Sequence, residues 1–581
     1  MRGGSLAVGF VVCLSTSACG PAGPGAGDAR GGGEAAARTG LHFTDVTATS
    51  GIDLVLTTGR VPAGELVEAN GTGVALIDFD GDGDLDVFTP NGATLDSPGR
   101  GPGCRLYENV STPGTGPRFV DATARAGLDF AGWGMGVAVG DVDGDGHDDL
   151  FVACFGPNVL LRNRGDGTFE DVSAAAGLDG PAASRGWSTG CAFGDVDGDG
   201  DLDLYVCNYV EFDAVRPPKP AQFKGVPVFR GPMSLTALPD VLYLNDGSGA
   251  FTPADASWGL DAVTPSYGLG VVMLDLDDDG RLELFVGNDS EANFLLDDAD
   301  PAAAGPGPRR LVDRAAMAGV GLSGTGVNQA TMGIAVADVD DNGRPDLFSS
   351  NFSNDANTLH CNLDGCFYED RSDLFGLGAV SRPFLGWSTM FFDFDHDADE
   401  DLVVFNGHIY PHASMATMDS EARQPPLLFE RRGARFVRAT AGAAGAWLDE
   451  AHDDRSAAFG DLDGDGDVDV VVGELSGPLR VLRNDRDGGG WLLVELRDGR
   501  DGSGNRRGLG SRVELRAGDA PVQRRWIFSG GGFQSASAAA AHFGLPADAG
   551  AVQLEVTWPD GTRQVVRDVA PGRRLVVTRT D

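Results

Sequence analysis

The nonapeptide DFDGDGDLD at residues 78–86 places aspartates at five alternate positions. Carboxylates that lie this close in a folded chain repel one another unless a cation or bound protons neutralise them. Six further copies make the peptide a repeat unit. They are DVDGDGHDD (141–149), DVDGDGDLD (195–203), DLDDDGRLE (275–283), DVDDNGRPD (338–346), DFDHDADED (393–401) and DLDGDGDVD (461–469). We call them loops 1 to 7 and number their positions 1 to 9.

Each loop stands in the same local context. A run of small and apolar residues precedes it, as in GMGVAVGD (134–141), and a β-type run follows it, as in LYVCNY (204–209). A third run ends in Asn, as in VLYLN (241–245), and a fourth resembles GTFEDVSAAAGL (167–178). Four strands repeated seven times predict an all-β fold with a seven-bladed β-propeller over residues 41–485.

The two ends of the repeat region indicate how the ring closes. The seventh unit stops after its third strand, VLRND (481–485), whereas LHFTDVTATSGI (41–52) has the fourth-strand pattern with no unit before it. We therefore expect the N-terminal strand to complete the last blade. This closure removes the open edge that an array of sheets would otherwise expose.

The loops have the residue types of a calcium site. Side chains at positions 1, 3, 5 and 9 converge, the carbonyl at position 7 joins them, and Gly at position 6 permits a sharp bend. Crowded hard oxygen ligands suit Ca²⁺, which takes six to eight oxygens. Up to seven Ca²⁺ are predicted, and solvated acidic turns without metal are the alternative. The predicted ligands are Asp78, Asp80, Asp82, Asp84, Asp86, Asp141, Asp143, Asp145, His147, Asp149, Asp195, Asp197, Asp199, Asp201, Asp203, Asp275, Asp277, Asp279, Arg281, Glu283, Asp338, Asp340, Asn342, Arg344, Asp346, Asp393, Asp395, Asp397, Asp399, Asp401, Asp461, Asp463, Asp465, Asp467 and Asp469, with position 7 contributing only its backbone carbonyl.

The loops account for most of the chain's net charge of −42. They hold 35 of the 86 acidic residues and two of the 44 basic ones. A chain this acidic does not offer the basic face that nucleic acid requires. Loops 1, 2, 3 and 7 match the pattern best, loop 5 has the neutral Asn342, and loop 6 has Ala398 in place of Gly and is expected to be the weakest site.

The N-terminus is typical of an export signal. Arg2 precedes the apolar run LAVGFVVCL (6–14), which is too short to span a bilayer, and STSAC (15–19) ends it with small residues. Residues 1–18 are the predicted signal peptide. Cys19 resembles the lipidated cysteine of a bacterial lipoprotein, although Thr16 stands where Leu is usual, and simple secretion is the alternative. Residues 19–40 are rich in Gly, Ala and Pro and predict a flexible tether.

Six cysteines remain after Cys13 and Cys19, an even number in an exported chain. Cys361 and Cys366 flank the turn sequence NLDG and are one predicted disulfide. Cys191 and Cys207 are equidistant from Asp199, so a symmetric hairpin would place them opposite each other as a second. Buried thiols are the alternative for this second pair.

Residues 486–581 show alternating strands and Gly-rich turns, which predict a small β-sandwich. The motifs are GWLLVELRDGRDGSGNRRGLGSRVELRAG (490–518), SGGGFQSASAAAAHFGLP (529–546) and VTWPDGTRQVV (556–566). These stretches resemble the ASPIC/UnbV domain, and the seven loops resemble FG-GAP/VCBS calcium-loop repeats. Together they are similar to the cartilage acidic protein family and its bacterial relatives. This resemblance implies an exported calcium-loop propeller, and it implies no activity.

No nucleophile elbow, metalloprotease motif or phosphate loop occurs in a supporting context. The segment FNGHIYPHA (405–413) alternates His408, Tyr410 and His412, which makes it a candidate catalytic or transition-metal segment; a structured rim loop is the alternative. We expect His542 to be packed. The predicted function is an exported, monomeric scaffold that binds a protein or glycan, reaches a membrane only through a lipid anchor, and functions in the periplasm, at the cell surface or after secretion. The alternative is an enzyme or accessory in secondary metabolism or polysaccharide modification.

Overall fold

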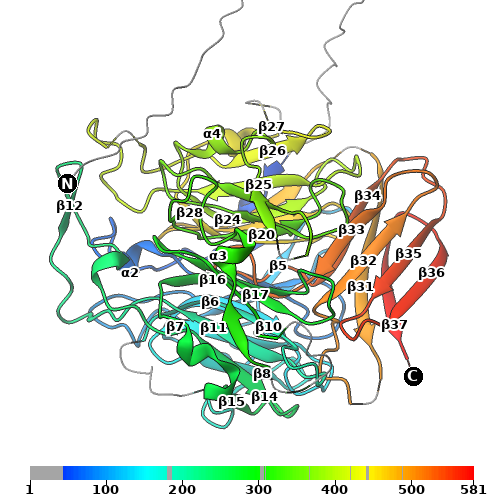
Figure 1. The fold of residues 1–581 in the computed structure, drawn as a ribbon, viewed down its shortest axis with the longest axis horizontal. Coiled ribbons are helices and arrows are strands. Elements are labelled where there is room, and N and C mark those ends of the chain that lie inside the picture. Colours follow the sequence, from blue (N-terminus) through cyan, green and yellow to red (C-terminus); the bar gives the residue numbers. More distant parts are fainter. Residues whose placement is uncertain are drawn as a thin grey trace, which may run out of the picture. The chain divides into compact units, whose positions relative to one another are not determined.

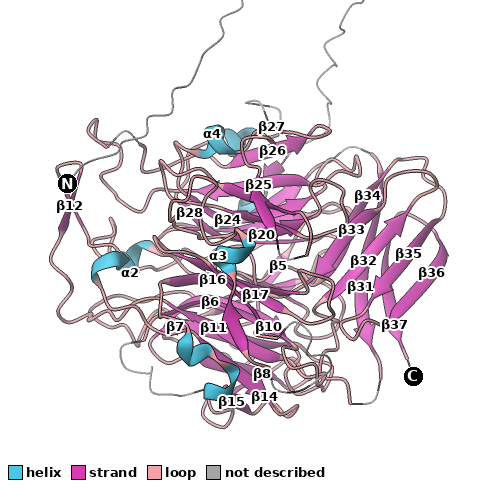
Figure 2. Ribbon diagram, in the orientation of Figure 1, coloured by secondary structure: helices cyan, strands magenta, loops and turns pink. Residues whose placement is uncertain are grey.

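A computed structural model describes residues 43–178, 186–300, 307, 309–365, 367–418, 420–439, 442, 444–486, 488–500 and 502–580. Strands dominate this part of the chain, and helices are short (Figure 2). The α-helices are α1 (Thr47–Ser50), α2 (Leu66–Ala69), α3 (Ala315–Ala318), α4 (Gly378–Ser381) and α5 (Ala446–Asp449), and the 3₁₀ turns are η2 (Pro232–Ser234), η3 (Ala256–Trp258) and η4 (Leu260–Ala262). Among the described residues, no helix has the length and apolar character needed to cross a membrane.

Seven four-stranded antiparallel sheets in the described residues form the blades (Figure 1). Blade 1 is β2 (Ala75–Ile77), β3 (Asp86–Thr89), β4 (Arg105–Asn109) and β5 (Phe119–Asp121), and blade 2 is β6 (Trp133–Gly140), β7 (Asp149–Phe155), β8 (Val159–Asn163) and β9 (Phe169–Asp171). Blade 3 is β10 (Ser188–Gly194), β11 (Asp203–Asn208), β14 (Val241–Asn245) and β15 (Phe251–Pro253), and blade 4 is β16 (Gly268–Leu274), β17 (Glu283–Asn288), β18 (Phe294–Asp298) and β19 (Leu311–Asp313).

The remaining blades follow the same order. Blade 5 is β20 (Ile334–Ala337), β21 (Asp346–Ser349), β22 (Thr358–Asn362) and β23 (Tyr368–Asp370), and blade 6 is β24 (Gly386–Phe392), β25 (Asp401–Asn406), β26 (Leu427–Arg431) and β27 (Phe436–Arg438). Blade 7 is β28 (Asp454–Gly460), β29 (Asp469–Glu474), β30 (Leu479–Asn484) and β1 (Phe43–Asp45). Strand β1 pairs antiparallel with β30, Phe43 opposite Asn484, so the prediction that the N-terminal strand completes the last blade is confirmed.

The first strands of successive blades lie side by side and close the ring. β2 contacts β6, β6 contacts β10, and the series continues through β16, β20, β24 and β28 back to β2. Glycines allow this close approach, because a Cβ at Gly136 would lie 1.9 Å from the Thr189 carbonyl oxygen and a Cβ at Gly190 would lie 2.5 Å from that of Leu269. The predicted all-β, seven-bladed architecture is therefore confirmed.

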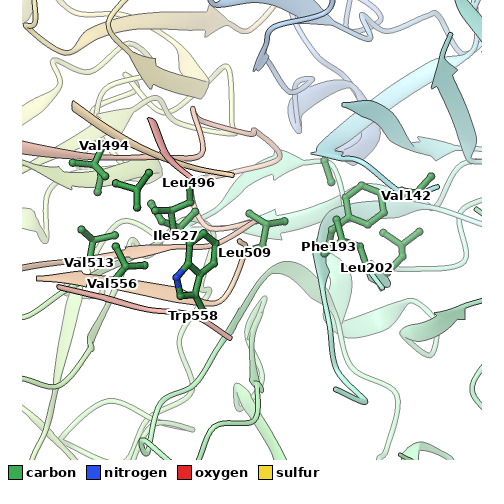
Figure 3. Close-up of a cluster of buried hydrophobic side chains, with 14 of the residues drawn as sticks. Val142, Phe193, Leu202, Val494, Leu496, Leu509, Val513, Ile527, Val556 and Trp558 are labelled. Carbon is green, nitrogen blue, oxygen red and sulfur yellow. The ribbon is translucent and has the colours of Figure 1, made fainter. Parts of the chain in front are cut away.

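The C-terminal strands form two further sheets (orange to red in Figure 1). One has the order β34 (Ala540–Leu545), β31 (Gly490–Asp498), β37 (Arg573–Arg579), and the other has the order β33 (Gln523–Ile527), β32 (Ser511–Arg516), β35 (Val552–Thr557), β36 (Arg563–Val569). Their facing side chains share one buried cluster with blades 2 and 3. In Figure 3, Leu509 lies between Trp558 and Ile527 of this C-terminal unit and Phe193 and Leu202 of blade 3.

The segment between β33 and β34 enters the centre of the ring and bonds to the first strands of the blades. Gly531 and Gly532 donate backbone hydrogen bonds to Val271 and Ile334 of blades 4 and 5, and the amide of Ala536 donates to Val74, next to β2. Gly530 has a φ of +87°, and a Cβ there would lie 2.2 Å from the Val271 carbonyl oxygen. Only glycine fits so close to a neighbouring backbone. The C-terminal unit thus fills the channel of the propeller.

The tip of this segment reaches an aromatic cluster at the other end of the channel. The Phe533 ring is fully buried and its centroid lies 4.7 Å from that of Trp387. The same cluster includes Trp133, which begins β6, Trp187, which directly precedes β10, and Tyr209, which directly follows β11. Insertions of blades 3 and 6 cover it, including the hairpin of β12 (Ala221–Phe223) and β13 (Val226–Val228).

The predicted disulfide between Cys191 and Cys207 is wrong. Both thiols are free and buried, and Cys191 pairs with Val206 across the hairpin. The hairpin is centred between Gly198 and Asp199, not on Asp199, and a shift of one residue moves a side chain to the other face of a sheet. Cys361 is also free and buried, with Glu369 opposite it, and Cys366 lies outside the described residues.

Candidate functional site

The seven loops adopt one backbone conformation. In each, position 9 begins the second strand of the blade and pairs with the residue just before position 1, as Asp149 does with Gly140. Position 6 has a positive φ throughout, from +77° at Ala398 to +100° at Gly200. Position 4 is also left-handed, even where it is Asp278, Asp341 or His396. The predicted turn at position 6 is therefore present, and a second one at position 4 accompanies it.

Hydrogen bonds within each loop aim the acidic side chains inward. The amide of position 7 donates to the side-chain oxygen of position 5 in all seven loops, as in Asp201 to Asp199 at 3.0 Å. The amide of position 6 donates to position 1, as in Gly200 to Asp195 at 3.0 Å. These local bonds hold the carboxylates in place before any ligand binds.

Position 9 connects the loop to its blade. In loop 2, the Asp149 carboxylate accepts the amide of Val142 at 2.9 Å through Oδ2 and the amide of Asn163 at 2.7 Å through Oδ1. Loops 1, 3, 5 and 7 show the same pair of bonds. A carboxylate at position 9 is thus a structural tie between three strands as well as a potential ligand.

The Asn that ends the third strand is a functional residue that the sequence prediction missed. Asn163 donates through Nδ2 to the carbonyl of Phe79, at position 2 of the preceding loop, at 2.9 Å. Six side chains make such links: Asn109, Asn163, Asn245, Arg309, Asn362 and Asn484. Between blades 5 and 6, Arg431 bonds instead to Asp341 of loop 5. The recurring Asn of the VLYLN-type strands was the available signal.

At least five loops bring three of their predicted carboxylates close together. One oxygen from each member of the following groups lies within 4.8 Å of the others: Asp78, Asp80 and Asp86; Asp141, Asp143 and Asp149; Asp195, Asp197 and Asp199; Asp275, Asp277 and Asp279; Asp338, Asp340 and Asp346. Burial raises the pKa of Asp195 to about 7 and that of Asp203 to about 8, and neighbouring carboxylates add to the rise. Burial likewise raises the pKa of Asp461 in loop 7 to about 7.

Several of these oxygens are buried without a hydrogen-bond donor among the described residues. They are Asp80 Oδ1, Glu283 Oε1, Asp338 Oδ1, Asp340 Oδ1, Asp401 Oδ2 and Asp463 Oδ1, at positions 1, 3 and 9 of five loops. A buried carboxylate oxygen without a partner is costly. The donor set is made only of hard oxygens, so it fits Ca²⁺ better than a soft transition metal.

Charge compensation differs among the loops. In loop 5, Arg524 of the C-terminal unit lies 3.0 Å from Asp338, and Arg371 lies 3.0 Å from Asp340. In loop 4, the side chain of Arg281 pairs with Asp279 at 3.0 Å, beside its backbone role at position 7. In loop 6, Ala398 holds a φ of +77° without the glycine that this conformation favours.

The C-terminal unit contacts every loop. Arg506 donates to the Gly144 carbonyl at 3.1 Å, and the Asn505 amide donates to the Gly200 carbonyl at 2.9 Å. The remaining loops are contacted through the pairs Arg574 with Gly83, Arg512 with Asp278, Arg524 with Asp338, Arg525 with Glu400 and His542 with Gly466. The loops are thus shared between the propeller and the C-terminal unit.

The candidate catalytic segment does not converge. His408 is buried, its Nδ1 accepts the Tyr410 amide at 3.0 Å, and its Nε2 lies 3.2 Å from Ser353 Oγ. Burial lowers the pKa of His408 to about 4. Tyr410 packs against Phe229, whereas His412 is exposed on the surface. His408 and His412 therefore do not share a site.

Comparison with known proteins finds matches in both regions of the chain. A family model described as ASPIC and UnbV matches residues 501–581, and one for the FG-GAP-like repeat matches residues 141–206. Cartilage acidic protein 1 of Mus musculus is 28% identical over 526 residues, covering 86% of this chain and 72% of its own length. The protein of that name in Homo sapiens is 27% identical over 527 residues, covering 86% and 70%.

Solved structures give weaker similarities. A lectin of Agrocybe aegerita that recognises non-reducing terminal N-acetylglucosamine is 13% identical, covers 72% of this chain and 91% of its own, and has a TM-score of 0.35. The exotype rhamnogalacturonan lyase YesX is 12% identical, covers 72% and 90%, and has a TM-score of 0.28. The chain thus has an FG-GAP-like repeat match and a C-terminal ASPIC and UnbV match, as its motifs predicted, and is homologous to cartilage acidic protein 1 over most of its length.

Proposed function

We propose that this protein is an exported binding scaffold whose propeller is stabilised by up to seven structural Ca²⁺ ions. The observation that carries the calcium proposal is the repeated set of buried carboxylate oxygens without donors at positions 1, 3 and 9 of the loops. A divalent cation in each loop would neutralise two or more carboxylates whose pKa values are raised by burial, such as Asp195 and Asp203.

Calcium in these loops would act on the whole fold. Each ion would bind the turn between the first two strands of a blade, and position 9 continues into bonds with the third strand. The C-terminal unit contacts all seven loops, so their occupancy would also stabilise its docking. Extracellular calcium modules bind at roughly 10⁻⁴–10⁻³ M, which implies filling outside the cell and not in the cytosol.

Chelation tests the calcium proposal. At 10 mM Ca²⁺, a site with such an affinity contributes roughly 1.4–2.7 kcal/mol to the free energy of unfolding. For a chain of this size each kcal/mol shifts the melting temperature by roughly 1 °C, so seven occupied sites should raise it by roughly 10–15 °C relative to protein in EDTA, measured by differential scanning calorimetry. Elemental analysis of protein dialysed against calcium should find several ions per chain. An unchanged melting temperature together with no bound calcium would refute the proposal.

We propose the face opposite the loops as the surface that binds a protein or glycan partner. The C-terminal unit covers the loop face and fills the channel, so the insertions of blades 3 and 6 offer the larger free surface. They expose apolar side chains: Val215 is 88% exposed and Met233 is 70% exposed. Affinity capture with the full chain, compared with Val215→Asp and Met233→Asp variants, tests this surface. Equal recovery of the same partners by all three proteins would place the binding surface elsewhere.

We propose export with either a lipid anchor at Cys19 or simple secretion, and a monomeric state in solution. The residues that carry the first proposal lie outside the described part of the chain. Mass spectrometry of the mature N-terminus distinguishes a diacylated Cys19 from an unmodified one. Light scattering of the purified protein measures its mass against the monomer's 60.3 kDa.

A further inference from the structure

Two histidines meet between loops 6 and 7, and neither is a predicted calcium ligand. His396 occupies position 4 of loop 6, and His542 comes from β34 of the C-terminal unit. Their ring centroids are 5.0 Å apart, and both side chains are buried. Asp467, at position 7 of loop 7, turns its side chain toward them, with Oδ1 3.4 Å from His396 Nε2. His396 is thus close to both His542 and Asp467, and the three side chains come from three segments.

Each imidazole has a ring nitrogen that lacks a hydrogen-bond partner among the described residues, namely His396 Nε2 and His542 Nδ1. His542 Nε2 lies 2.9 Å from the Gly466 carbonyl and therefore carries the proton that it donates. The lone pair of the neutral ring is then on Nδ1. A histidine that donates one N–H to a backbone carbonyl and keeps the other nitrogen free has the arrangement typical of a metal ligand.

The distance between His396 and Asp467 also fits a bridged pair. At 3.4 Å it is longer than the usual N–H···O hydrogen bond of about 2.9 Å. Two ligand atoms each about 2.1 Å from a tetrahedral ion lie about 3.4 Å apart.

We propose that His396, His542 and Asp467 form a binding site for a borderline divalent transition-metal ion, with Zn²⁺ as the best fit. Two imidazoles and one carboxylate are the ligand set of a zinc site that keeps one position for water. His542 also lines a cavity of about 170 Å³ between the C-terminal unit and the blades. The ion would join the C-terminal unit to two loops of the propeller.

The local charge permits a cation. Arg486 is close enough to lower the pKa of both histidines. Carboxylates of loops 6 and 7 surround that guanidinium and outnumber it: Asp393, Asp395, Asp397 and Asp467.

The test uses the full chain in excess Ca²⁺. The calcium loops are then filled, so that zinc bound in those loops is not counted as zinc at this site. We expect one Zn²⁺ per chain by elemental analysis, a rise in melting temperature on adding zinc, and visible d–d absorption when Co²⁺ replaces it. His542→Gln and His396→Gly should each weaken zinc binding at least tenfold and abolish the thermal shift. His396→Gly keeps the loop, because glycine occupies this position in four others.

The exposed His412 supplies the matched control, and His412→Ala should bind zinc as the parent does. Unchanged zinc affinity in His396→Gly and His542→Gln, or no zinc bound at 100-fold excess over protein with the calcium loops filled, would overturn the proposal. Bound calcium and bound zinc are measured on the same samples. If no variant binds calcium, that result contradicts the calcium proposal and not the zinc site.

Discussion

Loops 3 and 5 share a nine-residue pattern and a backbone conformation, yet they neutralise their carboxylates in different ways. Among the described residues, none of the five aspartates of loop 3 forms an ion pair with an arginine or lysine. In loop 5, Arg524 pairs with Asp338 and Arg371 with Asp340, and position 5 is the neutral Asn342. Loop 3 would therefore need an added cation or bound protons to neutralise its carboxylates, whereas loop 5 carries part of its compensation within the chain.

A ligand motif therefore does not by itself determine how much a site depends on metal. Of the two arginines that pair with loop 5, Arg371 directly follows the outermost strand of blade 5 and Arg524 lies in β33 of the C-terminal unit. A buried carboxylate can be compensated by a cation, a proton or a guanidinium, and each choice responds differently to chelation and pH. Loops 3 and 5 should therefore respond differently to changes in pH, in ligand charge and in the arginine partners.

The largest expected effect is on the pH dependence of the metal-free protein. Burial raises the pKa of Asp203 to about 8, far above the value of about 3.9 in an unfolded chain. Below pH 8 the folded state therefore binds protons that the unfolded state takes up only near pH 4. The free energy of unfolding should rise as the pH falls through this window, by about 1.4 kcal/mol per pH unit for each such carboxyl.

Bound calcium should remove this pH dependence of stability, because it takes the place of the protons on the loop carboxylates. Melting temperatures at pH 6 and pH 8, with calcium and after its removal, measure both cases. If the metal-free protein is less stable at pH 6 than at pH 8, burial and mutual repulsion do not raise the pKa values of the carboxylates in loops such as 195–203.

A reciprocal exchange at position 5 should sharpen the comparison. Asp199→Asn removes a charged ligand from loop 3, and Asn342→Asp adds one to loop 5. We expect roughly tenfold weaker calcium binding in the first variant and up to tenfold tighter binding in the second, about 1.4 kcal/mol each. Equilibrium dialysis at several calcium concentrations measures the change, with the exposed Asp261→Asn as control. Equal effects of both variants on bound calcium would remove the distinction between the loops.

A smaller effect is expected from removing an internal cation. Arg371→Met leaves Asp340 without its guanidinium partner, at a cost of about 1–3 kcal/mol in EDTA. Added calcium should reduce this cost, because the ion then compensates Asp340. Urea unfolding of Arg371→Met, Asp340→Asn and the double variant gives the coupling energy in each condition. A coupling that is the same with and without calcium would show that Arg371 and the ion do not compete.

Periodicity explains why so much of the propeller could be predicted. Seven copies of one pattern show the strands, the turns and the unpaired fourth-strand sequence at residues 41–52, and closure follows from the need to remove open edges. Local turn chemistry likewise predicted the converging aspartates. These features depend on residues within one unit, so a single sequence contains the information.

Contacts between distant segments could not be predicted in this way. Arg524 and Asp338 are 186 residues apart, and no local pattern pairs them. The Gly-rich segment near Phe533 was recognised as a family motif, but its position inside the channel follows only from backbone approaches such as that of Gly530 to Val271. The predicted pairing of Cys191 with Cys207 failed because the symmetry of a loop sequence does not determine the register of its hairpin.

The smallest expected effect concerns the backbone of loop 6. Ala398 holds a left-handed conformation that costs an L-residue roughly 1–2 kcal/mol, whereas glycine at this position has only its greater unfolded-state entropy against it. Ala398→Gly should therefore stabilise the protein by about 0.5–1 kcal/mol. The converse change in loop 3, Gly200→Ala, should destabilise it by a similar amount, because a Cβ there meets no atom within 4 Å and only the backbone strain acts.

Urea unfolding in saturating calcium measures both changes. If Ala398→Gly also raises the calcium affinity of loop 6, the strain lies in the ligand-bound turn. If it raises stability equally with and without calcium, the strain is independent of the ion. Ala398→Gly could leave the free energy of unfolding unchanged while Gly200→Ala lowers it. Loop 6 would then adopt its turn without backbone strain, and alanine would suit position 6 there as well as glycine suits it in loop 3.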